Sequence, residues 1–363
     1  MPQHTLEELQ MFLEEEIKFV KVVLMPDFFL DRFMALNCDL KHFTPMLKRV
    51  IDHKGGCIDG IRQTDLRGGN AVNTASALIS LGVNTTPLVC TSKLGSKLIR
   101  FHLKSQRADL SHVKIFESAS ITTAMEFKNK KGKVNVMLRD VGSLADFGPH
   151  HLDDEDFQLI QDADYVCVFN WAGTRRFGTK LADIVFRSVK DKGKGRTYYD
   201  TADPTTNKEK LPELMEKVLQ SKHIDILSVN ENEAVCYASQ LSSEVEELSD
   251  VLSFEDLAKE SARILSAQLS LRVDLHTTKF SATFTKGKET IVRAFKVPVL
   301  RVTGAGDAWN AGNILGDAYG LSDEVRLALA NAVAAYYISN PSGKHATREE
   351  LREFWQDLSK KKS

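Results

Sequence analysis

Apolar positions recur with two different periods along the chain. Leu6, Leu9, Phe12 and Leu13 follow one another at helical intervals near the N-terminus, which predicts an amphipathic helix within an extension over residues 1–18. An apolar run over 19–25, interrupted by Lys21, then ends at Pro26-Asp27 and predicts a buried strand. The first core strand therefore follows a helical extension.

Beyond residue 69, helix-like and strand-like segments alternate. We expect core strands over 86–90, 165–169, 197–200, 224–229 and 295–302, separated by helical stretches. Such alternation predicts an α/β fold of three layers, with a mostly parallel central sheet and helices on both faces. Segments 32–67 and 120–140 look like a small β lid, and 346–363 like a C-terminal helix.

Four polar side chains fall at the carboxyl ends of predicted strands: Asp27, Asn170, Asp200 and Asn230. In open α/β sheets, ligands bind beyond those ends. We therefore expect a ligand site at this edge.

Composition narrows the class of protein. The chain has 363 residues, a formal net charge of −1 and five scattered cysteines, so nothing global attracts it to nucleic acid or to anionic lipid. It has no membrane-length apolar run and no secretion signal at its start. We expect a cytoplasmic protein that binds neither nucleic acid nor membrane.

The segment 302–312 has the clearest chemistry. Gly304 and Gly306 allow a tight turn into a helix, where unpaired N–H groups attract an anion. Asp307, in the first turn, is placed to accept the proton of an attacking hydroxyl. The alternative is an aspartate that only stabilises the helix.

Two further segments combine polar residues with a helix start. Asn70 and Asn73 lie one turn apart after Gly68-Gly69 and suit a polyhydroxylated ligand. Asn230 and Glu233 could hold Mg²⁺ through water. Taken singly, each is more simply interpreted as an ordinary capped helix start.

Together, in this order, the three segments resemble the ribokinase family, also called the PfkB carbohydrate kinases. The resemblance implies a ribokinase-like kinase domain over 19–345 that transfers phosphoryl from ATP, with ADP left open, to a hydroxyl of a sugar-like acceptor. It also makes the lid a candidate homodimer contact.

Residue roles carry over from the same resemblance. It implies Asp307 as catalytic base, and Gly304, Ala305 and Gly306 as the anion hole. For the cofactors it implies Asn230 and Glu233, with Glu233 holding Mg²⁺ through water, and Asn331 near the nucleobase. The implied acceptor ligands are Asp31, Asp27, Gly68, Gly69, Asn70 and Asn73.

The sequence departs from the family at two places. Arg301 stands where the family has an aspartate that helps hold a monovalent cation, so we expect activity without added K⁺. The nucleotide loop 276–281 lacks its two glycines, and their replacements, Thr278 and Ser281, offer hydroxyls to the nucleotide.

Three alternatives stay open. Phe28, Phe29 and Phe33 could stack on a base, as in a nucleoside kinase of the same family, although core or lid packing is the simpler interpretation. An acceptor with a phosphate or carboxylate would suit Arg139, Arg175 and Arg176, which are favoured as solvent-exposed. Outside the enzymes, a non-catalytic nucleotide-binding sensor would be expected to lack Asp307.

Overall fold

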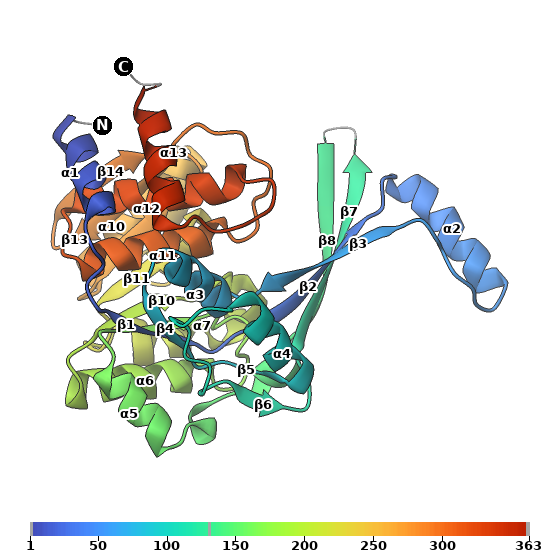
Figure 1. Cartoon of the computed structure of the whole chain (residues 1–363), viewed down its shortest axis with the longest axis horizontal. Helices are drawn as coiled ribbons and strands as arrows, with labels where there is room; N and C mark the ends of the chain where they lie inside the picture. Colours follow the sequence, from blue (N-terminus) through green and yellow to red (C-terminus); the bar gives the residue numbers. More distant parts are fainter. Residues whose placement is uncertain (1–2, 130–131, 361–363) are drawn as a thin grey trace.

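The computed structural model describes residues 3–129 and 132–360. Residues 1–2, 130–131 and 361–363 lie outside this part, so the tip of the predicted 120–140 hairpin and the outer ends of the 1–18 and 346–363 segments are not described. The described chain forms a layered body from which a long arm projects (Figure 1).

The body is built on an eight-stranded sheet in the order β14-β13-β12-β11-β10-β9-β1-β4. From β12 to β4 all neighbours are parallel, while β13 and β14 add an antiparallel edge. The strands are β1 (Lys21–Met25), β4 (Asn84–Pro87), β9 (Tyr165–Phe169), β10 (Arg196–Asp200), β11 (Ile226–Val229), β12 (Arg272–His276), β13 (Phe280–Thr285) and β14 (Lys288–Arg293). The mostly parallel sheet predicted from the sequence is confirmed.

Helices cover both faces of this sheet. Along β1, Val22 and Leu24 join one hydrophobic cluster, whereas Val23 and Met25 join the other, because successive side chains of a strand point to opposite faces. On the Val22 face lie α1 (Gln3–Glu14), α3 (Asn70–Ser80), α4 (Lys93–His102), α11 (Ala305–Ala318), α12 (Asp323–Ser339) and α13 (Arg348–Lys360). On the Val23 face lie α5 (Asp154–Asp162), α6 (Gly178–Lys192), α7 (Leu211–Leu214), α8 (Glu231–Ala238), α9 (Glu244–Ser249) and α10 (Phe254–Gln268).

The N- and C-terminal helices belong to the body. Phe12 of α1 and Trp355 of α13 are buried in the same cluster. The Arg348 guanidinium lies 4.4 Å from the centroid of the Phe12 ring. A short parallel pair, β5 (Cys90–Ser92) and β6 (Lys114–Phe116), flanks α4.

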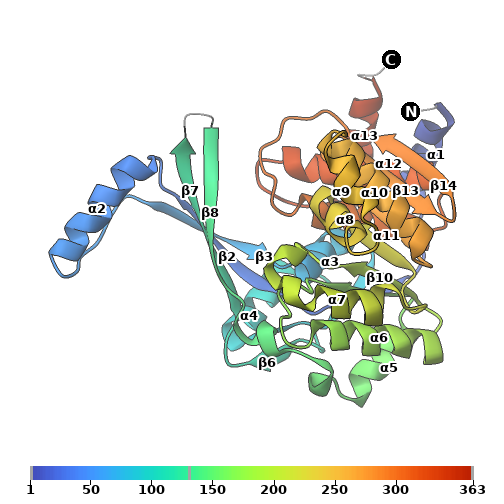
Figure 2. The same ribbon diagram turned by 180° about the vertical axis from the view of Figure 1, so that it is seen from behind.

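The projecting arm is the lid. It is a four-stranded sheet in the order β3-β2-β7-β8, made of β2 (Phe29–Ala35), β3 (Arg62–Gly68), β7 (Ser120–Asn129) and β8 (Gly132–Asp140). Between β2 and β3 the chain forms α2 (Leu40–Asp52), which extends away from the body in both views (Figures 1 and 2). The lid thus uses the predicted segments 32–67 and 120–140, but α2 was not predicted.

The strand predicted over 295–302 is wrong. Strand β14 already occupies that edge of the sheet, and the following segment pairs with no strand in the described chain. The backbone N–H of Leu300 donates instead to the carbonyl of Ile338, at 2.8 Å, which ties the segment to α12. Val299 and Val302 are exposed. The glycine turn is therefore entered from a loop.

Candidate active site

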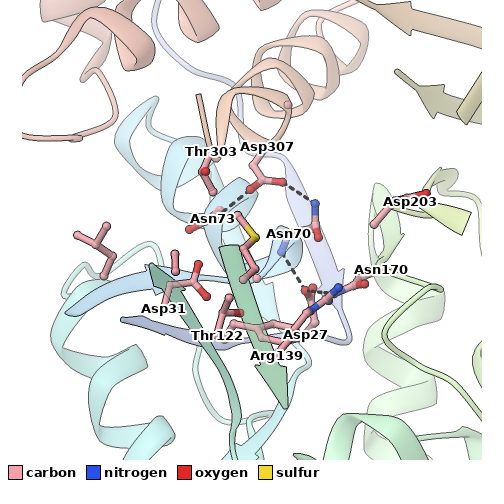
Figure 3. A pocket seen from close by; sticks show the side chains of 18 of the residues that line it. Asp27, Asp31, Asn70, Asn73, Thr122, Arg139, Asn170, Asp203, Thr303 and Asp307 are labelled. Atoms are coloured by element: carbon pink, nitrogen blue, oxygen red, sulfur yellow. Dashed lines mark hydrogen bonds between the residues drawn. The ribbon is translucent and has the colours of Figure 1, made fainter. Parts of the chain in front are cut away.

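A cavity of about 600 Å³ lies between the carboxyl edge of the sheet and the lid (Figure 3). Asp27, Asn170, Asp200 and Asn230, which follow β1, β9, β10 and β11, all line it. The four residues are therefore brought together as expected, because parallel strands bring their carboxyl ends to one edge of the sheet.

Helix α11 opens at one wall of this cavity. Gly304 caps it in a left-handed conformation, with φ of 86°, which favours glycine. The Ala305 amide donates within the turn to Val302 O, at 3.1 Å. In the described chain, the open amides of the first turn are those of Gly306 and Asp307. Of the predicted donors 304–306, the amide of Ala305 is used within the turn, whereas that of Gly306 is open.

The carboxylate of Asp307 points into the cavity between two amides of α3. Asn70 Nδ2 donates to its Oδ1 and Asn73 Nδ2 donates to its Oδ2, each at 2.9 Å (Figure 3). Burial raises the pKa of Asp307 to about 8, helped by the charges of Asp200 and Asp27 and opposed by the two asparagines. The two asparagines face the same way, as predicted, and their shared target is Asp307.

Asp27 fixes the start of α3. Its carboxylate accepts from the amides of Asn70 and Ala71, at 2.9 and 2.8 Å, and from Asn170 Nδ2, at 2.8 Å. Burial raises its pKa, while these three hydrogen bonds oppose the rise. Most of its acceptor capacity is used within the protein, so its role toward an acceptor stays a prediction.

The two glycines before α3 are required by close contacts. A Cβ on Gly68 would lie 2.2 Å from Oδ2 of Asp31, and one on Gly69 would lie 2.8 Å from Cα of Phe28. Gly69 also has φ of 90°. Gly68 thereby seats Asp31, which lines the cavity on β2; burial raises its pKa, opposed by its hydrogen bond to Thr122.

The lid adds a cation to this end of the cavity. Arg139 of β8 lines it, with its guanidinium 4.7 Å from the centroid of the Phe29 ring. Arg139 is exposed to solvent, as expected, although its side chain also lines the open cavity. Arg175 and Arg176 are exposed, as expected.

The three phenylalanines before the lid divide between core and cavity. Phe28 is fully buried in the core. Phe29 and Phe33 line the cavity instead.

The opposite wall is acidic. Asn230 and Glu233 form a capping box at the start of α8, in which Glu233 accepts from the backbone and the side-chain amide of Asn230, at 3.0 and 2.8 Å. Burial, together with the charge of Asp200, raises the pKa of Glu233 well above its usual range. Asp203 lines the same wall.

This acidic wall suits a hydrated cation. In the described chain, no cluster of three metal-ligating side chains converges on a point. Asp200, Asp203 and Glu233 line this wall and offer carboxyl oxygens to a cation such as Mg²⁺, which prefers to be held through water and phosphate.

The predicted nucleotide ligands are only partly brought together. Ser281 is fully buried and paired across from His276 in the β12–β13 hairpin, and Thr278 lies outside the cavity, its amide bonded to Glu231. Asn331 accepts from Trp309 Nε1 at 3.0 Å and is buried away from the cavity. His276, not singled out before, lines the cavity instead.

One cationic side chain, Arg301, lies next to the α11 turn and is partly exposed. Arg301 Nη2 donates to Pro341 O at 3.0 Å, and its guanidinium lies 5.7 Å from the centroid of the Tyr337 ring. The Tyr337 hydroxyl donates to Thr303 O, at 3.2 Å. Arg301 therefore supplies a fixed positive charge next to the turn that carries Gly304.

Arg67 connects the lid to Asp307 through Asn73. On β3, its Nε donates to Oδ1 of Asn73, at 3.0 Å. Burial lowers the pKa of Arg67, while the charge of Asp307 raises it. The amide of Asn73 is thus oriented with its nitrogen toward Asp307.

Sequence reasoning did not assign His276, Arg139 or Arg67 to the site, although it weighed Arg139 as a ligand for a phosphate or carboxylate on the acceptor. A usable signal existed for the first two. His276 opens the loop 276–281 that the resemblance assigns to the nucleotide, and Asn135, Met137 and Arg139 alternate along a lid strand. Arg67 had no signal besides its place before the glycines.

Solved structures with the same fold span nearly the whole chain. A ribokinase from Cryptococcus neoformans var. grubii serotype A in complex with ADP is 15% identical, with a TM-score of 0.71, over 93% of this chain and 99% of that one. An Arabidopsis thaliana ribokinase complexed with ribose and ATP is 19% identical, with a TM-score of 0.67, over 94% and 99%. A nucleoside kinase from Methanocaldococcus jannaschii is 18% identical, with a TM-score of 0.61, over 94% and 100%. The fold is therefore ribokinase-like.

Fold and site define a phosphotransferase of the ribokinase-like class. Residues 52–350 match the model of the pfkB family of carbohydrate kinases. The chain belongs to this family, and its acceptor group is a hydroxyl. A comparison with curated proteins gave no match. Among the described helices, none combines the length and the apolar character needed to cross a bilayer.

Proposed function

We propose that the protein transfers the terminal phosphoryl group of ATP to a hydroxyl of a sugar or sugar derivative, with Asp307 as general base. The observation that carries this proposal is the Asp307 carboxylate, held by Asn70 and Asn73 at the open N-terminus of α11. A base beside unpaired amides is the arrangement that phosphoryl transfer to a hydroxyl needs.

Each side chain has a definite task in this reaction. The acceptor hydroxyl lies against Asp307, which takes its proton as the oxygen attacks phosphorus. The amides of Gly306 and Asp307 donate to the equatorial oxygens of the phosphoryl group, where negative charge collects. Arg301 supports the turn from behind. Mg²⁺ would neutralise the phosphate charge when bound, held through water by Glu233 near Asn230.

The acceptor end favours a polyhydroxylated molecule. Asp31 and Arg139 offer an acceptor and a donor side by side from the lid, a combination that suits neighbouring hydroxyls. Asp27, Asp31 and Asp307 give this end a formal excess of carboxyl groups over the two arginines, Arg32 and Arg139. That excess disfavours acceptors with a phosphate or carboxylate.

A nucleoside acceptor is the second candidate within the family. The observation in its favour is that Phe29 and Phe33 line the cavity, where a base could stack on them. The sensor alternative is disfavoured by the intact base and its two amide donors.

Other parts of the proposal rest on the sequence. ATP as donor, with ADP open, is supported by relatives of the same fold with bound ADP or ATP. Independence from K⁺, a homodimer through the lid, the 19–345 domain limits and a cytoplasmic location stay predictions.

The test is a product assay with Mg·ATP and Mg·ADP against sugars, sugar acids, sugar phosphates and nucleosides. An Asp307→Asn variant, run in parallel, should bind both substrates and lose turnover. No phosphorylated product across the whole panel would overturn the proposal in favour of a binding protein.

A further inference from the structure

The end of strand β12 brings an unused histidine to the wall of the cavity. His276 lines the cavity, yet its Nε2 atom is buried and has no hydrogen-bond partner in the described chain. Leaving a buried polar atom unpaired costs about 1–3 kcal/mol. Such an atom in an active-site wall points to a ligand as its partner.

The unpaired nitrogen lies beside the anion-binding amides. A Cβ built on Gly306 would lie 3.3 Å from Cε1 of His276 and 3.9 Å from its Nε2, so this edge of the ring faces the open turn. The imidazole is also held in place, because it packs against Trp309 with ring centroids 5.0 Å apart. Trp309 in turn donates to Asn331.

The charged residues that line the cavity leave the place beside His276 to a neutral hydrogen-bond donor. Arg32 and Arg139, the arginines that line the cavity, come from the lid, whereas Asp200, Asp203 and Glu233 line the wall near β10 and α8. Burial lowers the pKa of His276 to about 4, so the ring is neutral near pH 7 and carries one N–H.

We propose that His276 donates its Nε2–H to a phosphate oxygen of the nucleotide, extending the set of donors begun by the amides of Gly306 and Asp307. This assignment rests on the proposed kinase function and adds His276 to the residues that bind the nucleotide phosphates. The ligand class is a nucleoside polyphosphate. Since the ring lies on Trp309, binding should also change the fluorescence of that indole.

Three variants separate the hydrogen bond from the packing. Phe at position 276 keeps a ring against Trp309 and removes both nitrogens, Gln offers a donor near the place of Nε2, and Asn offers one near Nδ1. We expect His276→Phe and His276→Asn to weaken binding of Mg·ATP and Mg·ADP about tenfold, the loss of one hydrogen bond. His276→Gln should stay within about threefold of the wild type, and the KM for the acceptor should not change.

Nucleotide affinity is measured by titration calorimetry and by tryptophan fluorescence, with Trp309→Phe identifying the signal and thermal unfolding checking each fold. Wild-type affinity in both His276→Phe and His276→Asn would overturn the assignment. Should His276→Phe fail to fold, His276→Asn decides alone. A wild type that binds neither nucleotide and phosphorylates no acceptor would defeat the proposed function as well, whereas turnover with unaltered variant affinities defeats only the role of His276.

Discussion

Replacing Asp307 by Asn separates what this carboxylate does for catalysis from what it costs in stability. Loss of the proton acceptor should lower kcat by about 10²–10⁴-fold. Acceptor and nucleotide should still bind, because Asn occupies the same space between Asn70 and Asn73. Activity of the wild type should rise with pH, since the base works when deprotonated.

The unfolding free energy should change with pH in the opposite direction and fall as pH rises. Burial raises the pKa of Asp307 from 3.8 to about 8, so between these values the folded protein binds more protons than the unfolded chain. The resulting stabilisation is complete below the unfolded pKa and is lost as pH rises through the folded one. Integrated from pH 6 to pH 8, the loss amounts to about 2 kcal/mol of unfolding free energy.

The assay is urea unfolding of the wild type and of Asp307→Asn at several pH values from 6 to 8. Asn presents an N–H where the carboxylate accepted from Asn70 or Asn73, which costs about 1–3 kcal/mol at every pH. The diagnostic quantity is therefore the change with pH in the difference between the two proteins. A control variant, Asp250→Asn, alters an exposed acid and should follow the wild type. If the difference between wild type and Asp307→Asn does not vary with pH, the burial argument is refuted.

Other predictions follow from single contacts. Arg67→Met should lower kcat more than it raises either KM in steady-state assays, and an unchanged kcat would contradict its positioning role. Because of Arg301, the wild type should be fully active in a tetramethylammonium buffer of fixed ionic strength, and several-fold activation by added K⁺ would count against this. Gly68→Ala should displace Asp31 and raise the acceptor KM about tenfold, by loss of one hydrogen bond. Gly69→Ala, strained at φ of 90°, should instead lower the unfolding free energy, measured in urea, by about 1–3 kcal/mol or more. If both substitutions changed the acceptor KM equally and the unfolding free energy equally, the distinction between the two glycines would be refuted.

The fold was predictable because the strands and helices of its layers follow from local patterns of apolar and polar residues. Runs such as Val22–Met25 are buried on both faces, as parallel strands require. Helix 40–52 was missed because Pro45 and turn residues obscure an amphipathic pattern that only the lid completes, where Phe43 packs on Phe127. The false strand at 295–302 has a strand composition, but no neighbour is left to pair with it.

The site was predictable where reactive or polar side chains directly follow glycine turns. Asp307 and the Asn70–Asn73 pair follow glycine turns, so their place at helix starts could be read from the sequence. Their mutual hydrogen bonds could not, because they join residues 237 and 234 positions apart. The fate of Ser281 also depends on pairing, since its register opposite His276 buries it.

The hydrogen bond from Arg67 to Asn73 makes the lid and the base parts of one linkage. Strand β3 leads through the two glycines into α3, and Asn73 passes the position of that strand on to Asp307 over bonds of 3.0 and 2.9 Å. A movement of the lid would therefore also move the Asp307 carboxylate in the absence of substrate. We therefore expect the orientation of Asp307 to depend on the position of the lid.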